Sequence, residues 1–286
     1  MSCIDLHSHS TVSDGSLAPA DLIRHAAQQG VKVLALTDHD DVAGLSAART
    51  AAQSVGISLI AGAEISVTWR DRTLHIVGLK IDPHYPEMQQ GLRAIRDGRV
   101  GRAAKIAEAL AQSGIDGSLE GAYGFVRENI ISRTHFACFL VSRGYAGNMK
   151  NVFKKFLVKG RPGYVPHRWA ALADVVRWIK DSGGRAVLAH PGRYGLGGTT
   201  LRQLLEEFRA LGGDALEVVS GSHTPEMTQR FAGLAAEYGF LASCGSDYHG
   251  PDRGYGEIGR IPPLPPGCAP VWHDWPEAAV LAVSAA

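Results

Sequence analysis

The residues of this chain best suited to chemistry are histidines and carboxylates that recur at the ends of short apolar segments. They are His7, His9, Asp14, His39, Glu64, His75, His190, Asp247 and His249. His7 and His9 are two positions apart after the apolar segment 2–6, and Asp247 and His249 repeat this spacing near the C-terminus. Because residues i and i+2 of an extended chain point to the same side, each pair can reach one ion. Imidazole together with carboxylate favours divalent ions such as Zn, Mn, Fe or Mg.

The segments that carry these residues alternate with helical patterns. We expect strands at 2–6, 31–36, 57–65, 74–81, 186–189, 215–219 and 240–244. Helical spacing occurs at 19–29, 42–54, 172–179, 201–211 and from 224 onward. Near-continuous apolar strands alternating with helices predict a parallel sheet covered on its outer face. About seven such units favour an α/β fold, a closed or nearly closed barrel of the (β/α) type.

The barrel explains why the candidate ligands should meet. Barrels of this type carry their chemistry on the loops after the strands. We place His39 and His190 directly after strands, Glu64 at the end of the third strand and His75 on the fourth. Imidazoles and carboxylates that converge in an apolar interior need a cation to offset their desolvation. A single one of them can be a polar residue that caps a strand, but nine at one end are poorly explained in this way. Nine ligands also exceed the needs of one ion, and Glu64 is the natural bridging carboxylate.

Residues 86–168 interrupt the alternation and are mostly helical and basic. We predict an inserted helical cap domain over the mouth of a barrel formed by 1–85 and 169–286. A lengthened pair of solvated surface helices is the alternative, since runs of charge commonly decorate exposed faces.

The insert also contains candidates for substrate binding. Arg99 and Arg102 are three residues apart and therefore share one face of a helix. Arg133, Thr134 and His135 open another helix, where free backbone N–H groups together with guanidinium and imidazole donors make a phosphate site. Ordinary helix capping with surface arginines is the alternative.

The composition sets broad limits. The chain has 286 residues, 45% of them hydrophobic, and a formal net charge of +1. This charge argues against bulk electrostatic binding to duplex DNA or to an anionic membrane. The four cysteines form no CxxC pair, which favours a reduced, cytoplasmic protein. No apolar run approaches the roughly 20 residues of a membrane helix, and nothing indicates an obligate protein partner.

Several motifs resemble those of the polymerase-and-histidinol-phosphatase (PHP) superfamily, in the right order over nearly the whole chain. They are Asp5-Leu6-His7-Ser8-His9-Ser10, Asp14-Gly15, Thr37-Asp38-His39-Asp40, Gly62-Ala63-Glu64-Ile65, Ala189-His190-Pro191 and Gly245-Ser246-Asp247-Tyr248-His249. The segment from Ile131 to Ala137 resembles a motif of the subgroup that contains the 3′,5′-nucleoside bisphosphate phosphatases and a related 5′-to-3′ exoribonuclease. That subgroup usually has proline where this chain has Thr134.

The resemblance implies a distorted (β/α)7 barrel, a mostly helical inserted cap and three divalent metal ions. One ion would be held by His7, His9, Glu64 and Asp247, a second by Glu64, His75 and His190, and a third by Asp14, His39 and His249. Many family members have histidine where Asp14 stands, and an aspartate favours a harder ion. We therefore expect Mn, with Mg, Fe or Zn as alternatives. Asp5 and Asp38 are expected to orient imidazoles rather than to bind metal.

These expectations define a metal-dependent phosphoric monoester hydrolase. We predict removal of the 3′-phosphate from a nucleoside 3′,5′-bisphosphate to give the 5′-monophosphate, with Glu64 and Asp247 as catalytic carboxylates. The predicted substrate contacts are Arg99, Arg102, Arg133, Thr134 and His135. Two alternatives use the same metal site: a 5′-3′ exoribonuclease acting on short RNA ends, and a histidinol-phosphate phosphatase. In the exoribonuclease, Lys154, Lys155, Lys159 and Arg161 would follow the strand. A non-catalytic metal-binding module is a third alternative, against which the complete ligand set counts.

Overall fold

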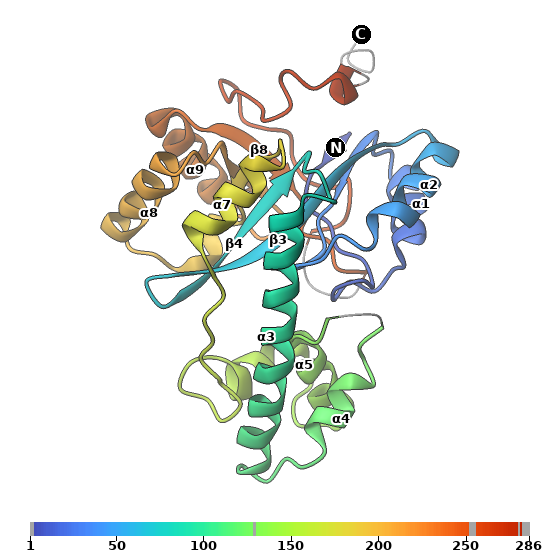
Figure 1. Cartoon of the computed structure of the whole chain (residues 1–286), viewed down its shortest axis with the longest axis vertical. Helices are drawn as coiled ribbons and strands as arrows, with labels where there is room; N and C mark the ends of the chain where they lie inside the picture. The colour runs from blue at the N-terminus through green and yellow to red at the C-terminus, as the bar shows by residue number, and fades with distance from the viewer. Residues whose placement is uncertain (1–2, 128–129, 252–255, 280, 282–286) are drawn as a thin grey trace.

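The computed structural model describes residues 3–127, 130–251, 256–279 and 281. At its centre, a sheet curls into a nearly closed barrel (Figure 1). Its strands are β1 (Ile4–Asp5), β2 (Val33–Leu36), β3 (Ser58–Trp69), β4 (Arg72–Leu79), β5 (Ala170–Ala171), β6 (Arg185–Leu188), β7 (Ala215–Ser220) and β8 (Leu241–Gly245). Their order is β1-β2-β3-β4-β6-β7-β8, and β5 pairs with β3. The two ends of the sheet meet where the Leu6 N–H donates to the Cys244 carbonyl at 3.0 Å. This arrangement confirms the predicted α/β barrel class.

Helices cover the outer face of the barrel. They are α1 (Pro19–Gln28), α2 (Leu45–Val55), α7 (Leu172–Asp181), α8 (Gly198–Ala210) and α9 (Pro225–Tyr238). Figure 1 shows α1 and α2 on one side of the sheet and α7, α8 and α9 on the other. Local sequence explains the helix ends: Thr224 caps α9 by accepting from the Met227 N–H at 3.3 Å, and Gly239 ends it at a φ of 69°.

The sheet is mixed, and the predicted all-parallel arrangement is wrong at one strand. β4 runs antiparallel to both β3 and β6. β3 continues beyond the predicted end at Ile65 to Trp69, so Glu64 lies inside the strand rather than at its end. Arg70 and Asp71, with φ values of 45° and 61°, make the tight turn into β4. In this hairpin, His75 lies opposite Ser66 and therefore on the same face as Glu64, two residues away.

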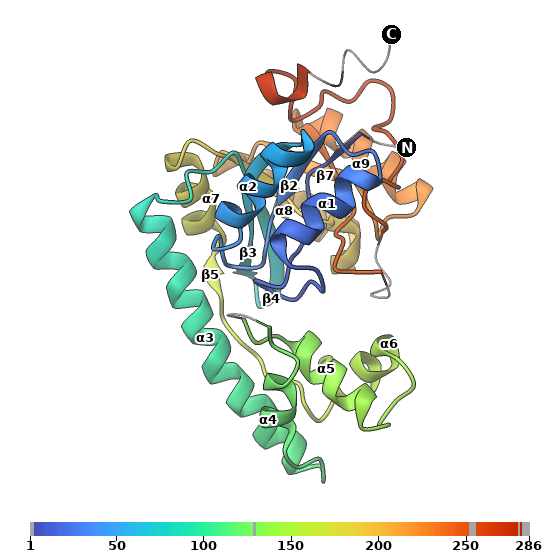
Figure 2. The same cartoon turned by 90° about the vertical axis from the view of Figure 1, so that its right-hand side faces the viewer.

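The insert contains α3 (Pro86–Ala111), α4 (Ser118–Tyr123), α5 (Arg133–Ser142), α6 (Met149–Val152) and the π-helical turn η1 (Phe153–Leu157). Figure 2 shows α3 running away from the barrel, with α4, α5 and α6 gathered beside its far half. Met88 and Leu92 of α3 belong to the barrel core, whereas Ile106 and Leu110 belong to a separate apolar core within the insert. The hydrophobic contacts of α3 thus pass from the barrel core to the insert core near Arg99. The domain boundaries 85/86 and 168/169 stay a prediction.

The described part of the chain also contains the short 3₁₀ turns η2 (Pro191–Tyr194) and η3 (Pro276–Ala278). Among the described helices, none combines the length and the apolar character needed to cross a membrane.

Candidate metal centre and adjoining cavity

The nine candidate ligands converge at one end of the barrel, and the tightest group surrounds a common point. The Nε2 atoms of His7 and His9 lie 3.3 and 3.2 Å from Oε2 of Glu64. The same two nitrogens lie 3.4 and 3.3 Å from Oδ1 of Asp247. These four residues come from the loop after β1, the middle of β3 and the loop after β8, so only the closed sheet brings them together.

Glu64 is the centre of the cluster. Its Oε2 also faces Nδ1 of His39 at 3.0 Å. Its Oε1 faces Nδ1 of His75 and Nε2 of His190, both at 2.8 Å. The two oxygens of one carboxylate therefore address different sets of imidazoles, which is the geometry that a bridging ligand requires.

A further set lies beside the first. Oδ1 of Asp14 is 3.3 Å from Nε2 of His249 and 3.9 Å from Nε2 of His39. Among the described residues, three groups have ligand atoms all within 4.8 Å of one another: His7, His9, Glu64 and Asp247; His9, Asp14, His39 and His249; and His39, Glu64 and His75. The first coincides with a set implied by the family resemblance. The second consists of the implied set Asp14, His39 and His249 with His9 added. The third contains His39 in place of the His190 of the implied set Glu64, His75 and His190.

The donor atoms of this cluster fit divalent cations. Within the described part of the chain, nine buried side-chain nitrogen or oxygen atoms lack a hydrogen-bond partner, and all but Ser118 Oγ belong to the predicted ligands. Examples are His7 Nε2, Glu64 Oε2, Asp14 Oδ1 and Asp247 Oδ1. Buried polar atoms are normally paired, since an unpaired one costs about 1–3 kcal/mol. Cations at the centre would pair with the atoms that face it, such as His7 Nε2, His9 Nε2, Glu64 Oε2 and Asp247 Oδ1.

Electrostatics point the same way. Burial raises the pKa of the Glu64 carboxyl, but the imidazoles of His75, His39 and His7 outweigh it and hold the pKa well below the usual value. Burial likewise opposes ionisation of Asp14 and Asp247, and the surrounding histidines again hold the pKa of each well below normal. Three buried carboxylates gathered at one place favour a compensating positive charge, which protonated imidazoles or bound cations can supply.

The backbone around the cluster is held in uncommon conformations. Asp40, His190 and Asp247 have φ values of 50°, 28° and 55°, in the left-handed region that side chains usually avoid. A Cβ at Gly245 would lie 2.2 Å from Cβ of His7, which explains the glycine before Ser246-Asp247. Strained backbone gathered at one place is typical of a functional site.

Two residues that the sequence analysis missed support the ligands. Glu217 of β7 lies 3.0 Å from Nδ1 of His7 through Oε1, and its Oε2 accepts from the His190 N–H. Arg193 donates to Oδ2 of Asp247 at 2.6 Å. A lone carboxylate inside the apolar segment 215–219 was the available signal for Glu217. Asp5, by contrast, accepts from the backbone N–H of Ser246 at 2.8 Å, and burial raises its pKa to about 6.

Asp38 also acts on the loops rather than on an imidazole. Its carboxylate accepts from the N–H and hydroxyl of Ser10 at 2.7 and 2.6 Å and from the hydroxyl of Ser13 at 2.6 Å. Asp5 and Asp38 were expected to orient imidazoles, but these hydrogen bonds join them to backbone N–H and serine hydroxyl groups. Among the remaining histidines, His223 accepts from the Gly192 N–H at 3.1 Å and so supports the loop after His190.

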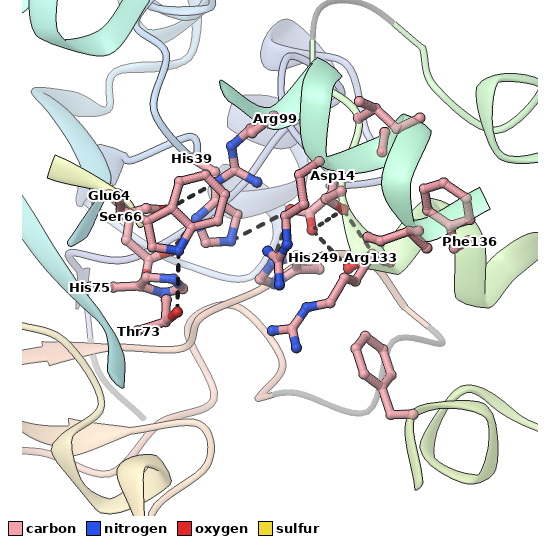
Figure 3. Close-up of a pocket in the computed structure, with 18 of the residues that line it drawn as sticks. Asp14, His39, Glu64, Ser66, Thr73, His75, Arg99, Arg133, Phe136 and His249 are labelled. Atoms are coloured by element: carbon pink, nitrogen blue, oxygen red, sulfur yellow. Dashed lines mark hydrogen bonds and ion pairs between the residues drawn. The ribbon is translucent and has the colours of Figure 1, made fainter. Parts of the chain in front are cut away.

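A cavity of about 460 Å³ leads from the cluster into the insert. In Figure 3, His75 and Phe136 lie towards opposite ends of this cavity, with Asp14 and Arg133 between them. The cluster end is lined by Asp14, His39, Glu64, His75, Asp247 and His249. The insert adds apolar side chains to the lining, with Phe136 at the end away from His75 in Figure 3; the apolar lining residues are Ala103, Ile106, Ile131, Phe136, Phe153 and Val158. The space thus joins the cluster of candidate ligands to a surface suited to an apolar or aromatic group.

The predicted substrate contacts divide in the structure. Arg99, Arg102, Arg133 and Thr134 line the cavity. His135 is absent from its lining and instead accepts from the Ser132 N–H at 3.0 Å, completing a capping box at the start of α5. The helix-capping alternative therefore applies to His135, because its Nδ1 accepts a hydrogen bond from the backbone of Ser132.

The two arginines of α3 also differ from each other. Arg99 is buried against Asp40, so its charge is already neutralised. Arg102 donates to the Val165 carbonyl at 3.1 and 3.2 Å. Burial, together with the positive charges of Arg133 and Arg99, lowers the pKa of Arg102 to about 9. A bound anion would relieve that repulsion.

Comparison with known proteins agrees with this geometry. Residues 5–181 match the family model described as the PHP domain. The chain is 46% identical over 275 residues to the 3′,5′-nucleoside bisphosphate phosphatase of Chromobacterium violaceum, covering 96% of each. It is 43% identical over 273 residues to the 5′-3′ exoribonuclease Rnm of Escherichia coli, covering 95% of this chain and 93% of that one. A solved amidohydrolase structure from Chromobacterium violaceum, with bound sulfate and no metal, superposes with a TM-score of 0.91 at 46% identity, covering 95% of each chain.

Proposed function

The chain belongs to the PHP domain family, and on that premise we propose that it removes the 3′-phosphate from nucleoside 3′,5′-bisphosphates. The products are the nucleoside 5′-monophosphate and inorganic phosphate. Family membership confirms the predicted class, a metal-dependent phosphoester hydrolase. The substrate is the proposal, and the relatives named as a bisphosphate phosphatase and as an exoribonuclease both support a nucleotide ligand.

One observation carries the proposal: a single cavity joins the ligand cluster to cationic side chains and then to an apolar end. Its volume of about 460 Å³ suits a ligand of nucleotide size. A 3′-phosphate would lie at the cluster, the 5′-phosphate beside Arg102 and Arg133, and the base against Phe136 and Phe153. Histidinol phosphate has one phosphate and a cationic amine, so it offers no second anion to the arginines of the insert.

We infer three divalent ions at the nine ligands, with Mn favoured by the mixture of imidazoles and carboxylates. When bound, such ions make hydroxide available from water near neutral pH and neutralise phosphoryl oxygens. Within the cluster, Glu64 presents one oxygen to His7, His9 and His39 and the other to His75 and His190. Asp247 presents Oδ1 to His7 and His9 while Arg193 holds its Oδ2.

Other residues of the chain bind and orient the substrate. Arg193 lines the cavity beside Asp247 and can donate to a phosphoryl oxygen. Arg102 and Arg133 would hold the phosphate that is not cleaved and thereby fix the direction of the scissile ester. Such remote binding energy can raise kcat as well as lower KM.

A second candidate, cleavage at the 5′ end of short RNA, is favoured by a neighbouring cavity of about 560 Å³. This space shares Arg102, Arg133 and Arg193 with the first cavity. Its other lining residues include Arg72, Lys159, Arg168, Tyr164 and Tyr194. Guanidinium and ammonium groups mixed with aromatic rings suit the backbone and bases of a single strand. Of the four basic residues predicted to follow such a strand, Lys159 lies in this lining.

A turnover panel on the Mn-loaded protein tests both candidates. The substrates are a nucleoside 3′,5′-bisphosphate, AMP, histidinol phosphate and a 5′-phosphorylated RNA oligomer. We expect the bisphosphate to have the highest kcat/KM and to yield the 5′-monophosphate. A higher kcat/KM for the RNA oligomer, with release of mononucleotides, would favour the second candidate, whereas preference for histidinol phosphate would overturn both.

A further inference from the structure

The insert contacts the barrel where one of the candidate ligand sets is built, the set of Asp14, His39 and His249. One contact joins Arg99 of α3 to Asp40, the residue after His39. The other joins Ser132 and Thr134 at the start of α5 to Asp14 itself. The set of His7, His9, Glu64 and Asp247 has support of a different origin, since Glu217 and Arg193 both belong to the barrel.

The Arg99 contact lies within a largely buried network. Nε of Arg99 donates to Oδ2 of Asp40 at 2.8 Å, Nη2 donates to the same oxygen, and Nη2 also reaches Ser66 Oγ at 3.0 Å. Asp40 in turn accepts from the Ser66 N–H at 2.7 Å. Arg96 donates to the Asp40 carbonyl at 2.8 Å. The network therefore ties α3 to the loop that carries His39 and to the strand that carries Glu64.

Backbone strain explains why this loop needs support. Asp40 has a φ of 50°, and its N–H donates to the Glu64 carbonyl at 2.9 Å. A non-glycine residue in this region persists only where the surroundings hold it. With the Asp40 carboxylate fixed by Arg99 and Ser66, the preceding imidazole of His39 is held towards Oε2 of Glu64 and Oδ1 of Asp14.

In the second contact, the two carboxylate oxygens of Asp14 face different partners. Oδ1 points to Nε2 of His249 and Nε2 of His39. Oδ2 accepts from the hydroxyl of Thr134 at 2.9 Å and from that of Ser132 at 3.3 Å. One oxygen is thus turned towards the cluster while the insert holds the other, which fixes the plane of the carboxylate.

We propose that Arg99 and Thr134 are positioning residues through which the insert sets metal affinity at Asp14, His39 and His249. This inference rests on the proposed metal-dependent function. It assigns Arg99 to the ligand loop rather than to the substrate phosphate, because Asp40 already neutralises its charge. It also gives the Thr134 hydroxyl a role that a proline at this position could not take over, because proline has no hydroxyl to donate to Asp14. Groups that orient metal ligands in this way typically change metal affinity by about 10–100-fold when removed.

Titration of the metal-free protein with Mn²⁺, followed by calorimetry and by electron paramagnetic resonance, tests the proposal without activity. In Thr134→Val, we expect one class of sites to bind roughly tenfold or more weakly, and Thr134→Ser to restore it, because serine keeps the hydroxyl. Arg99→Ala should weaken the same class, Arg99→Lys should recover part of the loss, and Arg93→Ala, an exposed arginine of the same helix, should bind as the wild type.

Kinetics separate positioning from substrate binding. At limiting Mn²⁺, Thr134→Val should lose kcat equally on a bisphosphate and on an aryl phosphate, with KM unchanged, and excess Mn²⁺ should restore kcat. Wild-type affinity at all sites in both Thr134→Val and Arg99→Ala would overturn the proposal, as would a raised KM for the bisphosphate alone. Arg99→Ala removes the guanidinium that neutralises the buried Asp40 carboxylate and can unfold the chain. If that variant is not recovered, Thr134→Val decides the test. Failure of the wild type to bind any Mn²⁺ would overturn the proposed function instead.

Discussion

Glu217 holds the imidazole of His7, with its Oε1 3.0 Å from Nδ1, while its Oε2 accepts from the backbone N–H of His190. One buried carboxylate on β7 therefore fixes residues from two distant loops. The contact at Nδ1 directs Nε2 of His7 towards Glu64 and Asp247. Orientation of a ligand by a group that does not itself bind the ion is common around protein metal sites.

Loss of this carboxylate should weaken metal binding. We expect Glu217→Ala to lower Mn²⁺ affinity by about 10–100-fold, because His7 loses its orienting partner. Elemental analysis after dialysis against limiting Mn²⁺ measures the effect. Glu206→Ala, an exposed glutamate of α8, is the matched control. Equal metal content in the two variants would contradict the role assigned to Glu217.

Removal of metal should abolish turnover. Treatment with a chelator is expected to stop phosphate release, and addition of Mn²⁺ to restore it, because the buried ligand atoms otherwise lack partners. Phosphate release from a nucleoside bisphosphate is the measurement. Full activity in protein shown by elemental analysis to be metal-free would refute the metal centre.

Glu64→Gln should damage the cluster far more than His25→Ala. Glu64 faces five imidazoles, and the amide removes a charge that the bridging position needs. His25 lies on α1, outside the cluster, and its Nε2 is 2.8 Å from Oε1 of Glu257. Metal stoichiometry and kcat of both variants are compared with the wild type. Similar losses in the two would remove the distinction between ligand and bystander.

Arg133→Ala should affect one substrate selectively. A charge-assisted contact is worth about 1.5–3 kcal/mol, so kcat/KM for a 3′,5′-bisphosphate should fall roughly tenfold to hundredfold. An aryl phosphate, which lacks the second anion, should be affected far less, and metal content should be unchanged. Arg143→Ala, exposed just after the same helix, serves as the control. Equal losses on both substrates would place Arg133 at the scissile phosphate instead.

The sequence by itself determined the class of the fold and the composition of the site. Apolar segments of strand length, most of which carry a histidine or carboxylate within them or soon after their end, are enough to predict a barrel with ligands at one rim. The reason is that the ends of neighbouring parallel strands meet at one edge. Helix starts were predicted closely where local signals are strong, as with Pro19 at the start of α1 and Thr224 immediately before α9.

The hairpin from β3 to β4 was not predicted, for a local reason. Two-residue hairpin turns with positive φ usually contain Asn-Gly or a similar pair, whereas Arg70-Asp71 carries no such signal. The strand direction, and with it the position of Glu64 inside β3, was decided by pairing along both strands. His75 still reaches the cluster, because residues opposite and diagonal in a hairpin share one face.

Only the tertiary structure decided which residues support the ligands. Glu217 and His7 are 210 positions apart, and Thr134 and Asp14 are 120 apart. No local pattern links such pairs, because a hydrogen bond between distant segments depends on how the closed sheet and the insert pack. The same packing pairs Arg99 with the Asp40 carboxylate, although Arg99, Arg102 and Arg133 all line the cavity. From the sequence these three arginines have the same chemistry, and burial against a carboxylate is what separates them.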